Sequence, residues 1–409
     1  MIKGIKFELR KSIKSKKNKL LFLGFIIYVV AFIILLGYKE KEYDKNQHTI
    51  FEYELQESGQ MLSIKTMELN DLEESNKTYN KVKEENNFYQ AQYSGSMLTT
   101  HFFSDRIKGN EKSEEDKTNF MIAMKTKYSS LKSGFEKGII DKNYLTDRGL
   151  SINLIDREIE YIDYLLETKQ DIMVNPYTRN GANFLKNFFA GFNLIVILIF
   201  ILLFVIDSYA LELREDSYKT LYTSPIRRNT ILLSKMIASF ILVTLAMIMV
   251  LVIAFVTVSL IFGYGELLYP LPINEGVTNL NPIVTNMNQG FIELFKLVLI
   301  NLFIFMVLTI FIIVFSISLS AKTNSEILSF GILITVLMLT YIMHSIDSFM
   351  NINRLFNPIS FIFNEDLMSS NLKINHTYGI LLQVLFSTLI ILLTTFKFRN
   401  KDLVGIKGE

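Results

Sequence analysis

The chain has 409 residues, half of them hydrophobic, and its 42 Lys and Arg nearly balance its 40 Asp and Glu to leave a formal net charge of +2. It has no cysteine, which excludes disulfides, thiolate metal sites and cysteine nucleophiles. The apolar residues come in long blocks, a distribution that is rare in soluble domains. Such runs predict membrane-spanning helices, because about 20 residues, each rising about 1.5 Å, cross a hydrocarbon core of about 30 Å.

Six uncharged apolar blocks divide the chain, and each predicts one transmembrane helix. Helices satisfy their own backbone hydrogen bonds in lipid, so a helical bundle is the expected architecture. The predicted fold class is an all-α polytopic membrane protein with six transmembrane helices and a helical extracellular domain between spans one and two. The predicted spans are residues 20–38, 188–206, 236–262, 297–320, 327–345 and 379–396.

The basic residues of the short segments predict the orientation. The first 19 residues carry eight Lys and Arg, the tail 397–409 carries four, and the loop 264–290 carries none. Short cytosolic segments are enriched in Lys and Arg, so both termini are expected in the cytosol. The bias toward Lys, Ile and Asn hints at an A/T-rich bacterial genome. We therefore expect a multi-pass protein of a bacterial cell membrane.

Residues 1–19 have the pattern of an amphipathic helix. Ile2, Ile5 and Leu9 recur at helical spacing, with basic residues between them. This pattern predicts an interfacial helix on the inner membrane surface, with its lysines toward anionic lipid headgroups. A positive anchor that only sets the topology is an equally supported reading.

Residues 39–187 form the largest charged segment and are expected outside the cell. Their apolar residues recur at helical spacing, which predicts several packed helices. Residues 94–96 and 108–110, each with a central glycine, are predicted turns. The clearest apolar seam consists of Ile155, Ile159, Ile162 and Leu166.

The remaining segments connect the spans. Residues 263–296 are predicted to form an outer loop and the start of span four. Residues 346–378 are too long for a tight turn and too interrupted for a full span, so we expect short re-entrant helices in the outer leaflet, protected by the bundle. Residues 207–235 form a cytosolic loop, and residues 397–409 form a cytosolic tail.

Motifs for catalysis are missing from the sequence. It has no G-x-x-x-x-G-K-[ST] phosphate-binding loop, no H-E-x-x-H zinc motif and no G-x-S-x-G nucleophile elbow. The cytosolic segments are too short to fold as an ATPase or kinase domain. We therefore expect no catalytic residue and no metal site, and any active transport needs energy from another chain.

The loop 207–235 is a charged island between two uncharged apolar runs. Ser224-Pro225 predicts a helix start, with Ser as N-cap and Pro at the first helical position. Upstream, apolar and charged residues alternate as on a short amphipathic helix parallel to the membrane. Such a helix could dock into a partner's groove; a solvated loop whose charges only enforce topology is the alternative.

The island resembles the permease subunits of type 2 ABC exporters. That family typically shows an acidic residue, a small-residue pair and a leucine, and then Pro, Arg and Lys leading into span three. It also shares six spans, an amphipathic N-terminal helix and re-entrant helices between spans five and six. The family's usual glycine near Asp216-Ser217 is absent here. The matching residues are Glu212 or Glu215, Ser217, Thr220-Leu221, Ser224-Pro225, Arg227 or Arg228, and Lys235.

The resemblance implies that ATP and magnesium are bound by a separate ABC ATP-binding subunit, with no cofactor on this chain. A coupling helix at roughly 211–223 would seat in that subunit. A second permease copy or a sister permease would complete the pathway within the membrane lipids, and no nucleic-acid partner is expected. The residues assigned to docking are Glu212, Glu215, Asp216, Tyr218, Leu221, Tyr222, Arg227 and Arg228.

Four residues are candidates for the substrate pathway. Asn193 and Asn301 lie within apolar runs, where polar groups usually face protein or water. Interhelical hydrogen bonding is the favoured alternative for both asparagines. Tyr341 and His344, near the outer end of span five, could join a lateral opening.

The large segment after span one is similar to that of permeases exporting amphipathic peptides, such as bacteriocins or phenol-soluble modulins. The Lys/Ile/Asn-rich composition without cysteine fits a Gram-positive source. Lipid-linked glycans, drugs and sodium are other possible substrates. A different class of function is a non-transporting sensor or immunity protein that binds a ligand through the extracellular domain.

Overall fold

The structure, a computed structural model, is helical and confirms the predicted fold class. It divides into two compact units, which we call the membrane unit (Met1–Ile33 with Asn180–Glu409) and the helical insert (Ile34–Arg179). The described residues are 1–74, 76, 78–110, 112–168, 174–190, 192–206, 228–272, 291–323, 325–346, 355–362 and 376–399.

Five helices in this part of the chain are long and apolar enough to cross a membrane. Five of the six predicted spans lie within them, and the first of these helices continues unbroken into the helical insert. The helices are α2 (Lys16–Asn70), α11 (Arg228–Phe262), α12 (Leu294–Thr323), α13 (Glu326–Ser345) and α16 (His376–Arg399).

The second predicted span differs from the rest. Instead of one helix over 188–206, the structure has α7 (Gly181–Phe188) and α8 (Phe192–Val205), whose axes are bent by 69°. The 14 residues of α8 extend only about 21 Å, which is short of a hydrocarbon core of about 30 Å. The two helices together make a sixth candidate span.

The direction of α7 is set by a contact that apolar composition does not reveal. The backbone N–H groups of Gly181 and Ala182 donate to the carbonyls of Gly263 and Tyr264 at 3.0 and 2.9 Å, just after α11 ends. The Asn180 side chain accepts from the Asn183 N–H and caps the helix. Helix starts carry unsatisfied N–H groups, and these bonds satisfy three of them while holding α7 against the end of α11.

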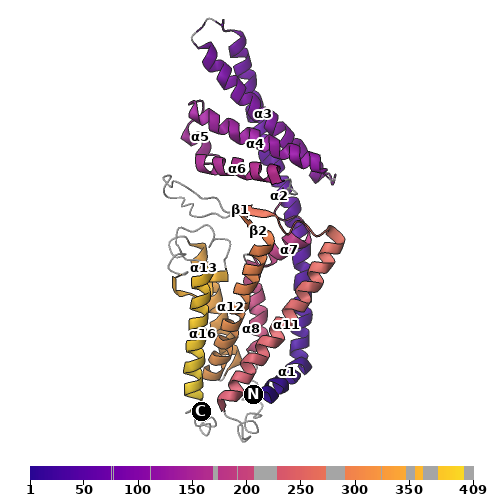
Figure 1. Cartoon of the computed structure of the whole chain (residues 1–409), viewed down its shortest axis with the longest axis vertical. Helices are drawn as coiled ribbons and strands as arrows, with labels where there is room; N and C mark the ends of the chain where they lie inside the picture. Colours follow the sequence, from indigo (N-terminus) through magenta and orange to yellow (C-terminus); the bar gives the residue numbers. More distant parts are fainter. Residues whose placement is uncertain are drawn as a thin grey trace. The chain divides into compact units, whose positions relative to one another are not determined.

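α12 is the central helix of the membrane unit. It contacts α7, α8, α11, α13 and α16 (Figure 1). Its buried side chains, such as Leu308, Ile313 and Ile317, point to every side of the helix. A helix that is apolar all round belongs in a core. By contrast, α16 exposes large apolar side chains such as Leu381 and Phe396 along most of its length.

Between α13 and α16 the structure describes residues 355–362, which include the 3-10 turn η1 (Ser360–Ile362). Asn357 donates to the Thr340 hydroxyl at 2.8 Å, and the Gln383 side chain donates to the Pro358 carbonyl at 3.0 Å. Phe361 is fully buried against Gly379, where an added Cβ would meet the ring at 2.2 Å. These contacts hold η1 inside the bundle. Of the predicted re-entrant segment 346–378, residues 376–378 instead begin α16, and residues 347–354 and 363–375 lie outside the described residues.

Two short strands, β1 (Pro270–Pro272) and β2 (Phe291–Glu293), pair antiparallel with Pro270 opposite Glu293. Their pairing brings together the two ends of the segment 273–290. Backbone bonds from Leu294 and Phe295 to the carbonyls of Tyr269 and Leu267, both 2.8 Å, extend the contact into the first turn of α12.

The helical insert combines the second part of α2 with four further helices. One of its core clusters consists of Phe88, Leu131, Ile140, Leu145 and Ile155. Of the predicted seam, Ile155 and Ile162 are buried, and Leu165 is buried in place of Leu166. The helices are α3 (Tyr79–Ile107), α4 (Glu114–Glu136), α5 (Lys142–Thr146) and α6 (Ile152–Thr168).

One of the two predicted glycine turns is confirmed and the other is wrong. Gly109 adopts a φ of +83° directly after α3, as a helix-ending glycine does. Gly95, however, lies in the middle of α3 and is buried against α4. A Cβ at Gly95 would meet Lys127 Cγ at 2.3 Å, so the glycine serves close helix packing instead of a turn.

Asp44 joins the insert's first helix to its last described residues. This buried carboxylate pairs with Arg106 of α3 at 3.1 Å and accepts from the Asn175 side chain at 2.9 Å. Arg179 pairs with Glu40 at 3.0 Å close by. The chain thus re-joins α2 before it enters α7.

We expect Gly95→Val to destabilise the helical insert by roughly 1–3 kcal/mol through overpacking. Helix propensity alone favours Val slightly over Gly, so a loss of stability reports the contact with α4. Thermal unfolding of the full chain in detergent measures it. Ser94→Val, on the exposed side of α3, is the matched control, and equal stability of the two variants would contradict the close packing.

Candidate functional site

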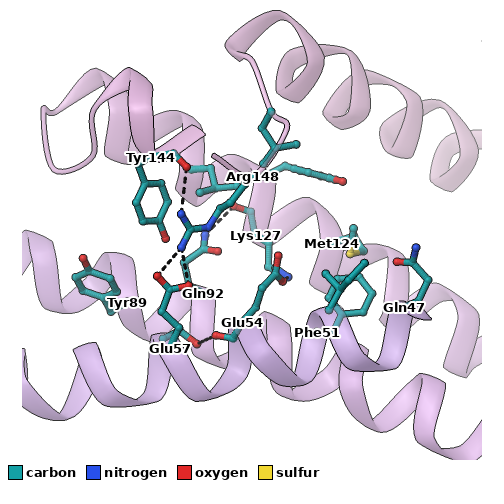
Figure 2. A pocket seen from close by; sticks show the side chains of 15 residues that line it. Gln47, Phe51, Glu54, Glu57, Tyr89, Gln92, Met124, Lys127, Tyr144 and Arg148 are labelled. Carbon is teal, nitrogen blue, oxygen red and sulfur yellow. Dashed lines mark hydrogen bonds and ion pairs between the residues drawn. The ribbon is translucent and has the colours of Figure 1, made fainter. Parts of the chain in front are cut away.

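The helical insert contains a cavity of about 190 Å³. Figure 2 shows its charged and aromatic side chains converging from several helices. α2 contributes one face of side chains at helical spacing, and α3, α4 and the α5 region supply the opposite walls. The lining residues from α2 are Gln47, Ile50, Phe51, Glu54, Glu57 and Ser58, and the others are Tyr89, Gln92, Met124, Lys127, Tyr128, Leu131, Tyr144, Arg148 and Leu150.

Lys127 lies at the back of this cavity and is 5% exposed. Its ammonium group pairs with Glu54 and lies 4.5 Å from the centre of the Phe51 ring. Burial lowers the pKa of Lys127, and the Glu54 carboxylate opposes that shift. Gln92 of α3 donates to the Lys127 carbonyl at 2.9 Å. Lys127 of α4 therefore contacts α2 through its ammonium group and α3 through its backbone carbonyl.

Arg148 forms the second ion pair of the cavity. One guanidinium nitrogen lies 2.5 Å from each Glu57 oxygen, and the group stacks 3.6 Å from the centre of the Tyr144 ring. Burial opposes its charge, but the hydrogen bond that Arg148 donates to Glu57 and the nearby negative groups together outweigh burial and raise the pKa of Arg148. Burial also raises the pKa of Tyr144 to about 12, so this phenol stays neutral at physiological pH.

A second charged feature lies in the membrane unit, where α1 (Ile2–Lys14) packs along α11. Lys235 Nζ lies 2.8 Å from Glu8 Oε1, and the two side chains are only 1% and 8% exposed. Gly4 allows the approach, because a Cβ there would meet the Ser234 hydroxyl at 2.9 Å. The α1–α11 junction is thus held by a buried ion pair.

Sequence analysis assigned Lys235 to the motif that leads into span three but did not single out Glu8. One signal was available, since Glu8 is the only acidic residue before Glu40 in a strongly basic segment. A buried charge needs a partner, but only the fold shows that these two residues, 227 positions apart, meet.

The predicted docking residues fall mostly outside the described part of the chain. Arg228 is the first residue of α11, seven positions before Lys235. The α1–α11 junction is therefore the described structure that directly follows the island. The docking residues outside the described ranges are Glu212, Glu215, Asp216, Tyr218, Leu221, Tyr222 and Arg227.

The predicted pathway residues lie on three helices of the membrane unit. Asn193 of α8 donates to the Asn187 carbonyl at 3.0 Å and accepts from the Tyr28 hydroxyl at 3.2 Å, so its hydrogen bonds join α7, α8 and α2. Asn301 is 5% exposed within α12. Tyr341 and His344 lie in the last two turns of α13, and Tyr341 is 36% exposed.

Residues 5–403 match the family described as ABC-2 family transporter protein. The chain belongs to this ABC-2 transporter family. Comparison with curated proteins and with solved structures gave no match. The family match covers nearly the whole chain, including the helical insert, and confirms the resemblance seen in the sequence. It identifies a multi-pass membrane protein with a permease role in an ABC transporter, associated with an ABC ATP-binding subunit.

In this ABC-2 permease we expect Glu8→Ala to destabilise the fold by about 3–5 kcal/mol, because it removes the carboxylate that lies 2.8 Å from the buried Lys235 ammonium group. Thermal unfolding in detergent measures the loss. Lys6→Ala, at an exposed position of the same helix, is the control. The charge-swapped double variant Glu8→Lys with Lys235→Glu should recover part of the loss, and a Glu8→Ala variant as stable as Lys6→Ala contradicts the ion pair.

Proposed function

We propose that this chain is the permease of an exporter that moves amphipathic peptides out of a bacterial cell, with a separate subunit hydrolysing ATP. The observation that carries the proposal is the ABC-2 family match over residues 5–403. It is supported by a sequence without a phosphate-binding loop. A permease of this kind therefore needs a nucleotide-binding partner to do work.

The proposed topology places both termini in the cytosol and the helical insert outside the cell. The eight Lys and Arg of the first 19 residues favour this orientation. α1 presents large apolar side chains, including Ile2, Phe7 and Ile13, at exposures of 82%, 57% and 58%. A basic helix with such side chains suits the cytosolic membrane surface.

The proposed docking site for the ATP-binding subunit is the charged island 207–235. It connects α8 to α11 in the chain, so a displacement of the island by the ATP-binding subunit would move two helices of the membrane unit. The Glu8–Lys235 ion pair, in which Oε1 and Nζ lie 2.8 Å apart, then transmits the same movement from α11 to α1. The island's acidic residues, with Glu215 and Asp216 at its centre, are the proposed contacts for a basic groove.

The proposed pathway forms between two permeases, either two copies of this chain or this chain and a sister subunit. α11, α13 and α16 expose large apolar side chains, among them Leu260, Ile342 and Leu392, which can face lipid or a second permease. Asn301, Tyr341 and His344 are the proposed pathway residues. The hydrogen bonds that join Asn193 to α2 and α7 fit the alternative reading of this residue as interhelical packing.

Replacing Glu215 and Asp216 together by Lys should weaken the complex with the ATP-binding subunit and lower the coupled ATPase rate. The reason is that two attractive charges become repulsive at the proposed docking surface. Co-purification yield and ATPase rate of the reconstituted complex are the measurements. The matched control reverses the adjacent acids Glu73 and Glu74, which lie exposed in the helical insert. An unchanged yield and rate would show that docking occurs elsewhere.

Amphipathic helical peptides should change the ATPase rate of the complex, because a transported substrate is coupled to the nucleotide cycle. A panel of such peptides, compared with scrambled peptides of equal composition that lack an apolar face, provides the measurement. Indifference to the whole panel would reject peptides and favour another hydrophobic substrate, such as a drug or a lipid-linked glycan.

A second candidate function is a sensor that binds a ligand with the helical insert without transporting it. The cavity of about 190 Å³ in the insert is the observation that favours it. The same co-purification separates the two functions: a stable complex with coupled ATPase activity supports the exporter, whereas ligand binding without any such complex supports the sensor.

A further inference from the structure

The cavity of the helical insert has the size and walls for one long side chain. Its volume of about 190 Å³ far exceeds the roughly 10–15 Å³ that a single water needs. Ile50, Phe51, Met124 and Leu131 supply apolar wall, and phenol rings from several helices supply the rest (Figure 2). An apolar stem can therefore pack in it, whereas the charged residues determine which end group it accepts.

The two cations of the cavity are occupied by groups of the protein itself. Lys127, whose side chain is 6% exposed, is held by Glu54 and lies over the Phe51 ring. Arg148, at 24% exposure, is bound by both oxygens of Glu57 and by the Tyr144 carbonyl at 3.1 Å. Neither cation presents a free, exposed face to an incoming anion.

The two carboxylates are the accessible charges. Glu54 and Glu57 are 29% and 37% exposed at their side chains, more than the cations that pair with them. A carboxylate offers about four acceptor positions, and Glu54 accepts from Lys127 alone among the described residues. The carboxylates can therefore accept further hydrogen bonds from a ligand. Donors that carry a positive charge form the strongest hydrogen bonds with a carboxylate.

The aromatic walls favour the same charge. The Phe51 and Tyr144 rings already attract Lys127 and Arg148 at 4.5 and 3.6 Å, and the Tyr89 ring lines the cavity beside Glu57 (Figure 2). The face of an aromatic ring attracts cations. An anionic end group would instead meet two exposed carboxylates.

We infer that this cavity binds the lysine side chain of an amphipathic peptide, with its stem against Phe51 and Met124 and its ammonium group at Glu54 and Glu57. The inference rests on the proposed function in taking a peptide as the ligand. It adds a recognition site within the helical insert, and it assigns the peptide a basic residue as its recognised feature.

The test is a binding measurement on the full-length permease in nanodiscs of neutral phosphatidylcholine, without the ATP-binding subunit. The probe is a fluorescent amphipathic helical peptide with one lysine on its polar face, and its counterpart carries norleucine in place of the lysine. Fluorescence anisotropy gives both dissociation constants. We expect the lysine peptide to bind about tenfold more tightly, as loss of one charge-assisted hydrogen bond predicts.

Two variants test the cavity, one by removing a charge and the other by reducing its volume. Glu57→Gln removes the more exposed carboxylate, and Ile50→Trp adds bulk at a residue that lines the cavity while keeping all four ion-pair residues unchanged. Each should weaken binding of the lysine peptide by about tenfold. Glu84→Gln is the matched control, because Glu84 is a surface carboxylate of the same unit, 49% exposed and 3.2 Å from Lys137, and it should stay within about twofold.

Equal binding of the two peptides, or equal binding by the Ile50→Trp variant and the unaltered chain, overturns the inference. If peptides still change the ATPase rate of the complex in that case, the proposed export function stands and only the cavity assignment falls. If no peptide binds or changes the ATPase rate, the peptide substrate and the cavity assignment both fall.

Discussion

The membrane unit depends on one constraint, which is that hydrocarbon offers no hydrogen-bond partner to a backbone N–H or C=O group. Continuous helices meet it over α11, α12, α13 and α16. Where the chain leaves helical geometry, other backbone groups take over: the first amides of α7 bond to the carbonyls of Gly263 and Tyr264, and β1 pairs with β2. The start of α7 is therefore compatible with a membrane, because its first amides are already bound within the protein.

The helical insert differs from the membrane unit, because charged residues are frequent throughout its sequence. It joins its helices partly through charged groups: Asp44 to Arg106, Glu54 to Lys127 and Glu57 to Arg148. All three acids lie on α2, so this helix provides the acidic face on which the other helices assemble. The pairs of Glu54 and Glu57 are only partly buried, and they line a polar cavity that an apolar core would have filled.

Glu8 and Lys235 are charged side chains of the membrane unit that are buried against each other. Their ion pair joins α1 to α11 at the end of the island 207–235, which is the proposed contact of the ATP-binding subunit. The family membership explains why the chain carries no nucleotide motif, because its role in an ABC transporter is that of the permease.

The sequence by itself determined the class of the protein, because the length of uncharged apolar runs is a direct response to the thickness of a membrane. It also determined the family, through the order of spans and the charged island. Only the tertiary structure decided which residues meet. The sequence predicts a turn at Gly95, but in the fold this glycine packs against α4. The helix α7, which precedes α8, is held by hydrogen bonds to residues just beyond α11. Glu8 pairs with Lys235, which lies 227 positions away in the chain. Apolar periodicity reports the environment of each segment, whereas these contacts depend on neighbours distant in the chain, which local patterns do not encode.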